Sequence, residues 1–356
     1  MDHWWAKQRL EDFIGVIDKK LDNYWQEEIK VNFGFNRRQK DLVRKILEHA
    51  KDHNLRPAKR LRASFVYYAY ALGNNVVDER TYKAAMAVEL VHTALLMHDD
   101  FMDQDDVRRG KPTTHKYFED GDVHYGEAMA VDVGDAVLLL GYQLLNDSGY
   151  EPEKVILAER QLLRGVVNTA YGQAYDIGLG KYKNWGEEDV IVLHRAKTAI
   201  YTYKNPLFIG AMLAGLEGEV FDVLDEYSMN GGVAFQLQDD VLGVYGDTEK
   251  TGKSANSDLL QGKVTLLILK ALEMGTDEQK GAVKKVWGKR RANAGDIEEA
   301  KKAIKESGSY EYSMDISREY ARKAVETAEK LRGLNLNREA IDYIQGIAEY
   351  MVHREV

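Results

Sequence analysis

The chain of 356 residues contains no cysteine and only four prolines. The lack of cysteine excludes disulfide bonds, thiolate metal sites and cysteine nucleophiles. A basic surplus is also missing, because 49 Lys and Arg residues are set against 58 Asp and Glu, a formal net charge of −9. This balance argues against a nucleic-acid binder, which would carry a basic surface. No apolar run approaches the ~20 residues of a membrane span, so we expect a cytoplasmic protein without an integral membrane segment.

Long stretches between the prolines carry apolar residues at three- and four-residue spacing. Residues 81–102 and 189–213 are good examples, and neither shows the strict alternation that is typical of strands. Turn signals rich in Gly and Asn separate the helical segments, and no low-complexity linker divides the chain. The pattern predicts an all-α protein, which we interpret as a single domain over residues 1–356.

Two aspartate clusters each follow an apolar helical segment. The first contains Asp99, Asp100 and Asp103, and the second contains Asp239 and Asp240. Residues three and four apart share a helix face, so the carboxylates of the first cluster point into one space. Clusters made only of oxygen ligands suit Mg²⁺, which usually bridges a few carboxylates to substrate phosphates. The pair of clusters predicts a diphosphate held between metal ions, with a solvated acidic surface as the alternative.

Basic residues lie close to these clusters in the sequence. Arg108 and Arg109 follow the first cluster, and each guanidinium can bind two phosphate oxygens, although pairing with nearby aspartates is the alternative. Lys59 and Arg62 share a helix face, and a solvated helix start would explain them equally well. His92 precedes Asp99 by two helical turns on the same face, which raises it above an ordinary core histidine.

Taken together, these segments resemble the trans-isoprenyl diphosphate synthases, the polyprenyl synthetases of the short-chain type that make farnesyl and geranylgeranyl diphosphate. The resemblance covers nearly the whole chain. The matching segments are Lys59–Arg62, Val91–Thr93, His98–Asp103, Arg108–Gly110, Gly172–Asp176, Lys197–Thr198, Phe235–Asp240 and Tyr350–Glu355.

The resemblance implies a homodimer of antiparallel helical bundles, with the two aspartate motifs facing each other across a deep central cavity. It implies a Mg²⁺-dependent condensation of isopentenyl diphosphate with an allylic diphosphate, in which three Mg²⁺ ions hold the allylic substrate. Isopentenyl diphosphate would bind to basic residues without metal. The implied partners are therefore small diphosphate substrates and a second copy of the chain.

The resemblance also assigns roles to individual residues. The implied metal ligands are Asp99, Asp103 and Asp239 together with Asp100, supported by Asp240 and Asp176. The implied binding residues for the allylic diphosphate are Arg108, Lys197 and Lys253. Those for isopentenyl diphosphate are Lys59, Arg62, His92 and Arg109. The implied catalytic residues, which include two that stabilise a carbocation by their dipoles, are Lys197, Thr198, Gln236 and Asp240.

One departure from the family pattern concerns the second motif. Gly243 stands where a third aspartate is usual, and Asp247 is the nearest acid that could replace it through a water molecule. We still expect activity, because the first aspartate of this motif makes the direct metal contact in the family.

Product length in the family is set by side chains just before the first motif. Here these positions are Ala94 and Leu95, and neither is aromatic, so geranylgeranyl diphosphate is the favoured product. Tyr171 and Tyr175 could close the cavity earlier, which leaves farnesyl diphosphate or a mixture as the alternative.

Two other classes of protein share parts of this pattern. A class I terpene cyclase would carry an Asn/Ser/Glu triad in place of Asp239 and Asp240, and it would not need a site for isopentenyl diphosphate. A non-catalytic subunit of a prenyl synthase would typically have lost aspartates or basic residues that this chain keeps.

Overall fold

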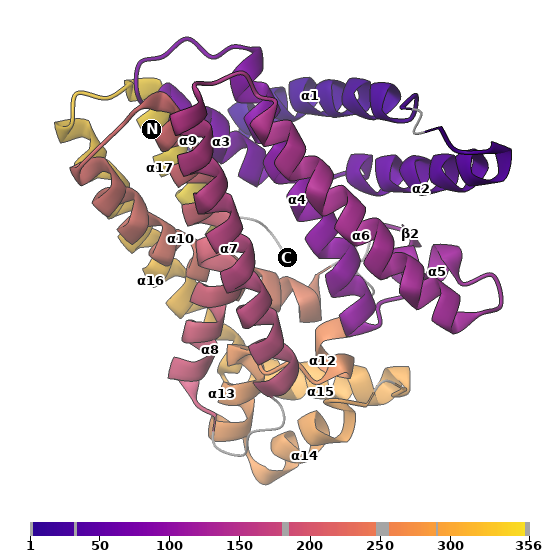
Figure 1. Cartoon of the computed structure of the whole chain (residues 1–356). Helices are drawn as coiled ribbons and strands as arrows, with labels where there is room; N and C mark the ends of the chain where they lie inside the picture. The colour runs from indigo at the N-terminus through magenta and orange to yellow at the C-terminus, as the bar shows by residue number, and fades with distance from the viewer. Residues whose placement is uncertain (1–2, 32–33, 180–184, 247–255, 290, 353–356) are drawn as a thin grey trace. The chain divides into compact units, whose positions relative to one another are not determined.

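The structure is a computed structural model that describes residues 3–31, 34–179, 185–246, 256–289 and 291–352. The predicted all-α class is confirmed (Figure 1), and the strands in the described residues are the short antiparallel pair β1 (Val107–Arg108) and β2 (Lys111–Pro112). The chain forms two compact units. The N-terminal unit contains residues 5–162 and 206–217, and the C-terminal unit contains residues 1–4, 163–205 and 218–356. The single domain and the deep cavity stay predictions.

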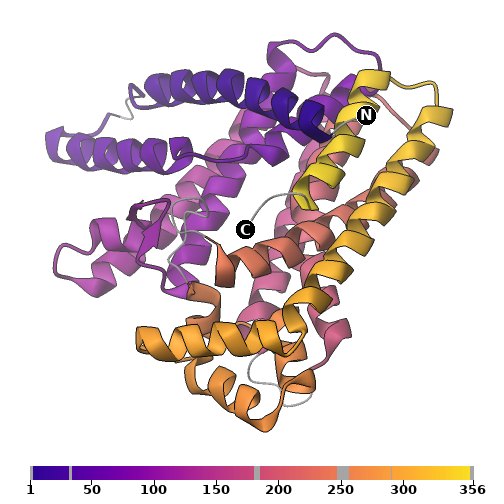
Figure 2. The same ribbon diagram turned by 180° about the vertical axis from the view of Figure 1, so that it is seen from behind.

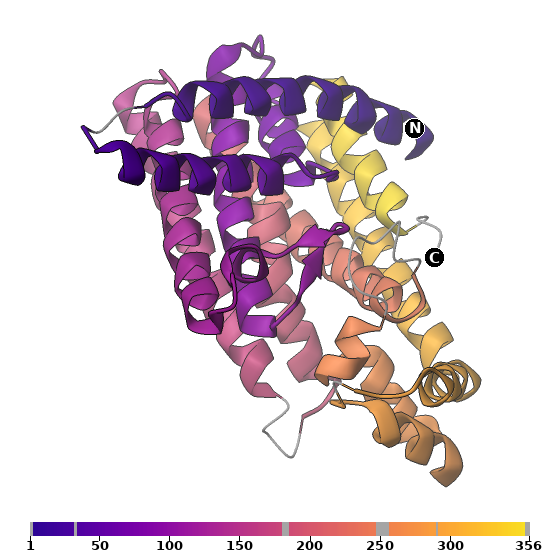
Figure 3. The same ribbon diagram turned by 90° about the vertical axis from the view of Figure 1, so that its right-hand side faces the viewer.

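The N-terminal unit is built from long helices. Its elements are α1 (His3–Glu28), α2 (Arg37–Leu55), α3 (Leu61–Ala71), α4 (Glu79–Asp103), α5 (Thr114–Phe118), α6 (Val123–Asn146), the first part of α7 (Pro152–Leu179) and most of α9 (Asn205–Ala214). Figure 3 shows α1 and α2 lying side by side, where Trp25 Nε1 donates to Asn54 Oδ1 at 2.9 Å. This buried bond fixes the end of α2, which carries residues of the site.

Local sequence signals set the limits of these helices. A capping box of Asn36 and Gln39 begins α2, and Pro57 ends it because the residue before a proline avoids the helical conformation. Arg56 accordingly has an extended backbone, with ψ of 146°. Asp78 caps α4 by accepting from the backbone N–H of Arg80, and α4 ends at Gln104 in the left-handed region.

Helices α4 and α6 pack closely along their length (Figure 1). A side chain at Gly134 would collide with His98, and one at Gly141 would collide with Val91, so glycine permits this approach. By length and composition α6 is apolar enough to cross a membrane. However, 44% of its most apolar stretch is buried inside the protein, and core helices of water-soluble proteins meet the same criteria.

The C-terminal unit surrounds the long helix α10. Its elements are the rest of α7, α8 (Glu187–His194), the π-helix η1 (Arg195–Lys204), α10 (Glu219–Tyr245), α12 (Ser257–Gln261), α13 (Leu266–Met274), α14 (Asp277–Val286), α15 (Ala294–Glu306), α16 (Ser309–Glu329), the 3₁₀ turn η2 (Lys330–Gly333) and α17 (Arg338–Val352). Helix α16 packs against both α10 and α17, and Figure 2 shows α16 and α17 as neighbouring yellow helices. Tyr227 of α10 donates its hydroxyl to the carbonyl of Ile344 at 2.6 Å, which fastens α17 to this centre.

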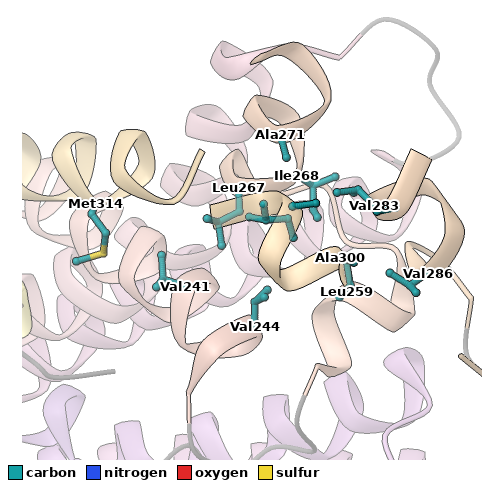
Figure 4. Close-up of a cluster of buried hydrophobic side chains, with 13 residues drawn as sticks. Val241, Val244, Leu259, Leu267, Ile268, Ala271, Val283, Val286, Ala300 and Met314 are labelled. Carbon is teal, nitrogen blue, oxygen red and sulfur yellow. The ribbon is translucent and has the colours of Figure 1, made fainter. Parts of the chain in front are cut away.

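A hydrophobic cluster holds the end of α10 that carries the second aspartate motif (Figure 4). Val241 and Val244 of α10 pack there with Leu267 and Ile268 of α13 and with Met314 of α16. All five side chains are at most 7% exposed. Because Val241 directly follows Asp240, this apolar contact fixes the rotation of α10 about its axis at the second motif.

Candidate active site

The first aspartate motif forms the last turn of α4, and its carboxylates differ in exposure. Asp99 and Asp103, four residues apart, are partly exposed, whereas Asp100 is completely buried. The C-terminal end of a helix already carries partial negative charge, so three carboxylates there require nearby cations. The exposed pair fits an oxygen-binding ion, and the burial of Asp100 favours a supporting role over the direct ligation that we predicted for it.

Arg108 neutralises the buried carboxylate of Asp100. Its Nε donates to Asp100 Oδ1 at 2.5 Å, Nη2 contacts the same oxygen, and Nη2 also lies 3.9 Å from Asp99 Oδ2. Burial alone would raise the pKa of Asp100, but the Arg108 charge prevails and lowers this pKa below its ordinary value. On the other side, His53 Nε2 of α2 lies 3.6 Å from Asp100 Oδ2. Arg108 is therefore held in place beside the exposed Asp99.

Arg108 reaches Asp100 because the chain turns back directly after α4. The hairpin of β1 and β2 has Arg109 and Gly110 at its turn, with φ of 52° and 74°. Two consecutive left-handed residues are the signature of a tight two-residue hairpin turn. The all-helical pattern of the sequence gave no indication of these strands, which are too short to show alternation.

The predicted isopentenyl diphosphate residues form a cationic group in the N-terminal unit. Arg62 Nη1 lies 3.0 Å from His92 Nε2, and Lys59 is exposed at the start of α3. Burial and the charges of Arg62 and Arg109 lower the pKa of His92 well below its usual value, so its ring is neutral and accepts from Arg62. Burial and the charge of Arg108 lower the pKa of Arg109 to about 10. Cations that repel one another in this way favour a bound anion.

The second aspartate motif lies on α10 and is supported by polar side chains of α10, η1 and α8. Asp239 is partly exposed and Asp240 is buried. Gln236 Nε2 donates to Asp240 Oδ1 at 2.8 Å, and Thr198 Oγ1 donates to Gln236 Oε1 at 2.6 Å. His194 Nε2 lies 3.1 Å from Asp240 Oδ2. Three predicted catalytic residues thus belong to one connected chain of hydrogen bonds.

Lys197 and Thr198 lie on the π-helix η1, an unusual element that often marks functional sites. Lys197 Nζ donates to Asp176 Oδ2 of α7 at 2.7 Å. A Cβ on Gly172 of α7 would approach the Lys197 backbone to 2.9 Å, and one on Gly232 of α10 would approach Ala199 Cα to 2.3 Å. Glycines on two neighbouring helices therefore let the wide π-helix fit between them.

Gly243, the departure in the second motif, is packed against an acid from another helix. A Cβ at this position would lie 2.2 Å from Asp258 Oδ2 of α12, which is far inside contact distance. The buried Asp258 carboxylate therefore occupies the space beside α10 into which a side chain at position 243 would extend. Asp247 and Lys253, to which we gave roles from the sequence, lie outside the described residues.

The predicted chain-length residues lie on the α4 face toward α6. Ala94 is fully buried and Leu95 is partly exposed, and both lie between Val91 and His98, the residues that contact the α6 glycines. The Tyr175 hydroxyl donates a hydrogen bond to Asp189 Oδ1 at 2.9 Å, and the side chain of Tyr171 on α7 is 69% exposed. Their predicted effect on product length stays a prediction.

The donor set fits Mg²⁺ in the manner expected for diphosphate enzymes. Among the described residues, no three His, Asp or Glu side chains are grouped so that they could hold a metal ion, and the three carboxylates of the first motif do not converge as the helix spacing predicts, because Asp100 is buried. Mg²⁺ does not require such a group, since it is commonly held by one or two carboxylates, several waters and substrate phosphates. Asp99, Asp103 and Asp239 are the partly exposed carboxylates that would supply such ligands.

Three residues that contact and orient the predicted site residues were not identified from the sequence alone. His53 and His194 each approach the second aspartate of a motif, and Arg56 donates to the hairpin backbone. The spacing of His194, three residues before Lys197, was a usable signal, because both would lie on one helical face. His53 and Arg56 gave no comparable signal, since their partners lie about 50 residues away in the chain.

Comparison with known proteins places this site in a family. The model of the family described as polyprenyl synthetase matches residues 44–304, which contain both aspartate motifs and all the predicted site residues. The geranylgeranyl diphosphate synthase of Saccharolobus solfataricus is 32% identical over 343 residues, which are 94% of this chain and 98% of that protein. That of Methanosarcina mazei is 34% identical over 298 residues, 83% and 86% of the two chains.

The solved structures extend the likeness to the fold. The geranylgeranyl pyrophosphate synthase of Corynebacterium glutamicum, complexed with isoprenyl diphosphate and magnesium, is similar with a TM-score of 0.88. The two are 27% identical, and the match covers 97% of this chain and 99% of that one. The resemblance found in the motifs is thereby confirmed across the sequence and the fold. The chain therefore belongs to the polyprenyl synthetase family of prenyltransferases.

Proposed function

We propose that the protein condenses isopentenyl diphosphate head-to-tail with dimethylallyl, geranyl or farnesyl diphosphate, and that geranylgeranyl diphosphate is the main product. The observation that carries this proposal is that one chain contains two kinds of side-chain group able to bind a diphosphate. One kind is the exposed carboxylates of the two motifs, and the other is the cationic group of Arg62 and Arg109 with the neutral His92. Relatives that carry the name geranylgeranyl diphosphate synthase support it.

In this mechanism the allylic diphosphate binds between carboxylates and cations. Asp99, Asp103 and Asp239 would hold Mg²⁺, which supplies charge neutralisation of the diphosphate and of the departing pyrophosphate. Arg108 and Lys197 contribute hydrogen bonds to the diphosphate oxygens. When the carbon–oxygen bond breaks, its electron pair leaves with pyrophosphate and an allylic cation remains. The oxygen dipoles of the Thr198 and Gln236 pair then stabilise this positive charge.

Isopentenyl diphosphate is held separately by Lys59, Arg62, His92 and Arg109. Its diphosphate relieves the burial cost and the repulsion from neighbouring arginines that together lower the pKa of Arg109 to about 10. Held near the allylic cation, its double bond supplies the electrons of the new carbon–carbon bond. A proton then leaves the adjacent carbon, and the released pyrophosphate is the base that we propose for it.

The test is direct. Purified protein, Mg²⁺, isopentenyl diphosphate and each allylic diphosphate are incubated, and the prenyl products are sized by mass spectrometry. Condensation that stops when the metal is chelated is the expected result. The absence of condensation with all three allylic substrates would overturn the proposal.

Product length is tested on α4. Leu95→Phe adds bulk on the α4 face toward α6, so we expect products shorter than twenty carbons, including farnesyl diphosphate. Leu42→Phe, the same change at a leucine near the start of α2 that is 42% exposed, is the matched control and should leave the distribution unchanged. An unchanged distribution in Leu95→Phe would place the length determinant elsewhere.

We further propose that the protein works as a homodimer in the cytoplasm. The support for a dimer is an exposed apolar face on α6, where Leu139 is 65% and Val131 is 44% exposed. Large exposed apolar side chains on one helix face mark interaction surfaces. Light scattering after gel filtration should report a dimer, and Leu139→Glu should shift the protein toward monomers. A monomeric wild type would contradict this part.

A further inference from the structure

Arg56 donates hydrogen bonds to both strands of the hairpin that carries Arg108 and Arg109. Its side chain is buried, at the point where Pro57 ends α2. Nη1 donates to the carbonyl of Arg108 in β1 at 3.0 Å, and Nη2 donates to the carbonyl of Pro112 in β2 at 3.0 Å. One planar guanidinium therefore spans the stem of the hairpin.

Two further contacts connect Arg56 to its surroundings. Its Nε and Nη2 both donate to Asp52 Oδ2 at 3.1 Å, one helical turn earlier in α2. Its own backbone carbonyl accepts a hydrogen bond from Arg109 Nη1 at 3.3 Å. The side chain of Arg56 thus fixes the stem, and its main chain fixes the arginine at the turn.

The hairpin needs such external support. Its strands have two residues each, and an isolated two-stranded hairpin is marginally stable in water even when it is longer. Arg109 also has a φ of 52°, which non-glycine residues adopt at a cost. Without Arg56 the carbonyls of Arg108 and Pro112 would each lose a hydrogen bond from a buried guanidinium.

We propose that Arg56 is a positioning residue that sets the orientation of Arg108 and Arg109 together and so couples the two diphosphate sites. The inference rests on the proposed function, in which Arg108 serves the allylic substrate and Arg109 serves isopentenyl diphosphate. Arg108 and Arg109 are consecutive, yet the first bonds Asp100 and the second bonds the Arg56 carbonyl. Movement of the hairpin stem therefore displaces both guanidinium groups at once.

The first experiment replaces the planar fork by a single ammonium group. Arg56→Lys keeps the positive charge but cannot reach Asp52 and both hairpin carbonyls together. We expect the KM values of isopentenyl and allylic diphosphate both to rise about tenfold, the effect of one or two lost charged hydrogen bonds. Calorimetric titration with isopentenyl diphosphate alone, without metal, should show the same loss of affinity.

A double-mutant cycle separates positioning from general damage. In the wild type, Arg109→Gln removes a well-placed guanidinium and weakens isopentenyl diphosphate binding. In the Arg56→Lys background, Arg109 is already displaced, so the same change should cost at least about threefold less, the size of coupling that contacting residues show. Additive effects of the two changes would overturn the proposal, because a merely structural role of Arg56 is additive with Arg109.

Matched variants keep the outcome interpretable. Arg332→Lys breaks an arginine fork on Asp342 and Gln345 in the C-terminal unit and should leave both KM values unchanged. If Arg56→Lys does not fold, Asp52→Asn weakens the anchor of Arg56 while leaving Arg56 in place, and it should raise both KM values by a smaller factor. Asp52 also pairs with Lys111 of β2, so Lys111→Gln, which removes that ion pair alone, must raise the KM values less than Asp52→Asn does. Wild-type protein that neither binds isopentenyl diphosphate nor condenses it would overturn the proposed function. Active wild type with unchanged KM values in the Arg56 and Asp52 variants would overturn this inference alone.

Discussion

The two aspartate motifs have the same beginning in sequence and different surroundings in the structure. In both, the first aspartate is partly exposed and the second is buried. A histidine from another helix approaches each buried carboxylate, His53 at Asp100 and His194 at Asp240. The shared arrangement indicates that the second aspartate of each motif acts on the orientation of its neighbours, while the first is available to ligands.

The motifs differ in what balances the buried charge. Asp100 is paired with the guanidinium of Arg108, whereas Asp240 accepts from the amide of Gln236. In the first motif, the buried carboxylate is thus balanced by the full positive charge of Arg108 on the hairpin. In the second motif, it accepts a hydrogen bond from the amide dipole of Gln236 on the same helix. One sequence pattern can therefore be stabilised in two ways. The same substitution in the two motifs is expected to lower the free energy of unfolding by different amounts.

The largest effects should come from the exposed aspartates, where the two motifs are expected to behave alike. Asp99→Ala and Asp239→Ala should each lower kcat/KM by about 10²–10³-fold, the range seen when one electrostatic contact to a transition state is lost. Circular dichroism should show an unchanged helical fold. Asp106→Ala, which removes an exposed carboxylate that pairs with Lys116, is the control. Near-normal turnover in either variant would show that its motif is structural.

The buried aspartates should respond unequally. Asp100→Asn leaves the buried Arg108 without its counter-charge and should cost about 3–5 kcal/mol of unfolding free energy. Asp240→Asn changes the hydrogen bond from the Gln236 amide and the contact with His194, so about 1–2 kcal/mol is expected. Urea denaturation measures both values. Equal losses would remove the distinction between charge and dipole support.

The third position of the second motif provides a smaller test. Gly243→Ala places a Cβ 2.2 Å from Asp258 Oδ2, so Asp258 must shift, and overpacking of this kind costs about 1–3 kcal/mol. Gly281→Ala in α14 meets nothing within 4 Å and is the matched control. It should be neutral or slightly stabilising because alanine favours helix. A Gly243→Ala protein as stable as the control would contradict the packing at this position.

The pH dependence of stability should differ between the two units. Burial lowers the pKa of His49 to about 3 and lowers the pKa of His53, while unfolding restores a pKa near 6.5. Their stabilising contribution is present above pH ~6.5 and falls as pH decreases, by about 1.4 kcal/mol per histidine per pH unit. Hydrogen exchange at pH 7 and 5.5 should show α2 losing protection before α10. A His49→Gln/His53→Gln protein should lose this pH dependence.

The sequence predicted the parts that depend on local pattern. The helices and the motifs follow from periodicity and family resemblance. Thr198 and Gln236 were given the same role of stabilising a carbocation, and the structure brings their side-chain oxygens to 2.6 Å. Arg62 and His92, 30 residues apart, likewise meet at 3.0 Å. Such pairs could be predicted because each partner already stood in a recognisable motif.

The other parts of the site depend on contacts between residues far apart in the chain, and such contacts leave no pattern in the local sequence. The Asp258 carboxylate beside Gly243 could not be found from the sequence, because it depends on where α12 packs against α10. The role of Asp247 stays a prediction. Arg56 stood outside every motif, and its burial depends on a hairpin that the helical period did not reveal. Residues that position others are difficult to find from sequence, because their function lies in contacts and not in chemistry of their own.

The direction of the side chains on the π-helix η1 depends on the number of residues that the segment contains. Its wide turns use hydrogen bonds from residue i to residue i+5, so the segment holds more residues than an α-helix with the same number of turns. Deleting Ala196 would favour ordinary helical turns and would change the direction in which Thr198 points relative to the preceding helix. The direction in which Thr198 faces Gln236 is therefore specified by the number of residues before it, and a deletion that removes no functional group would misdirect the site.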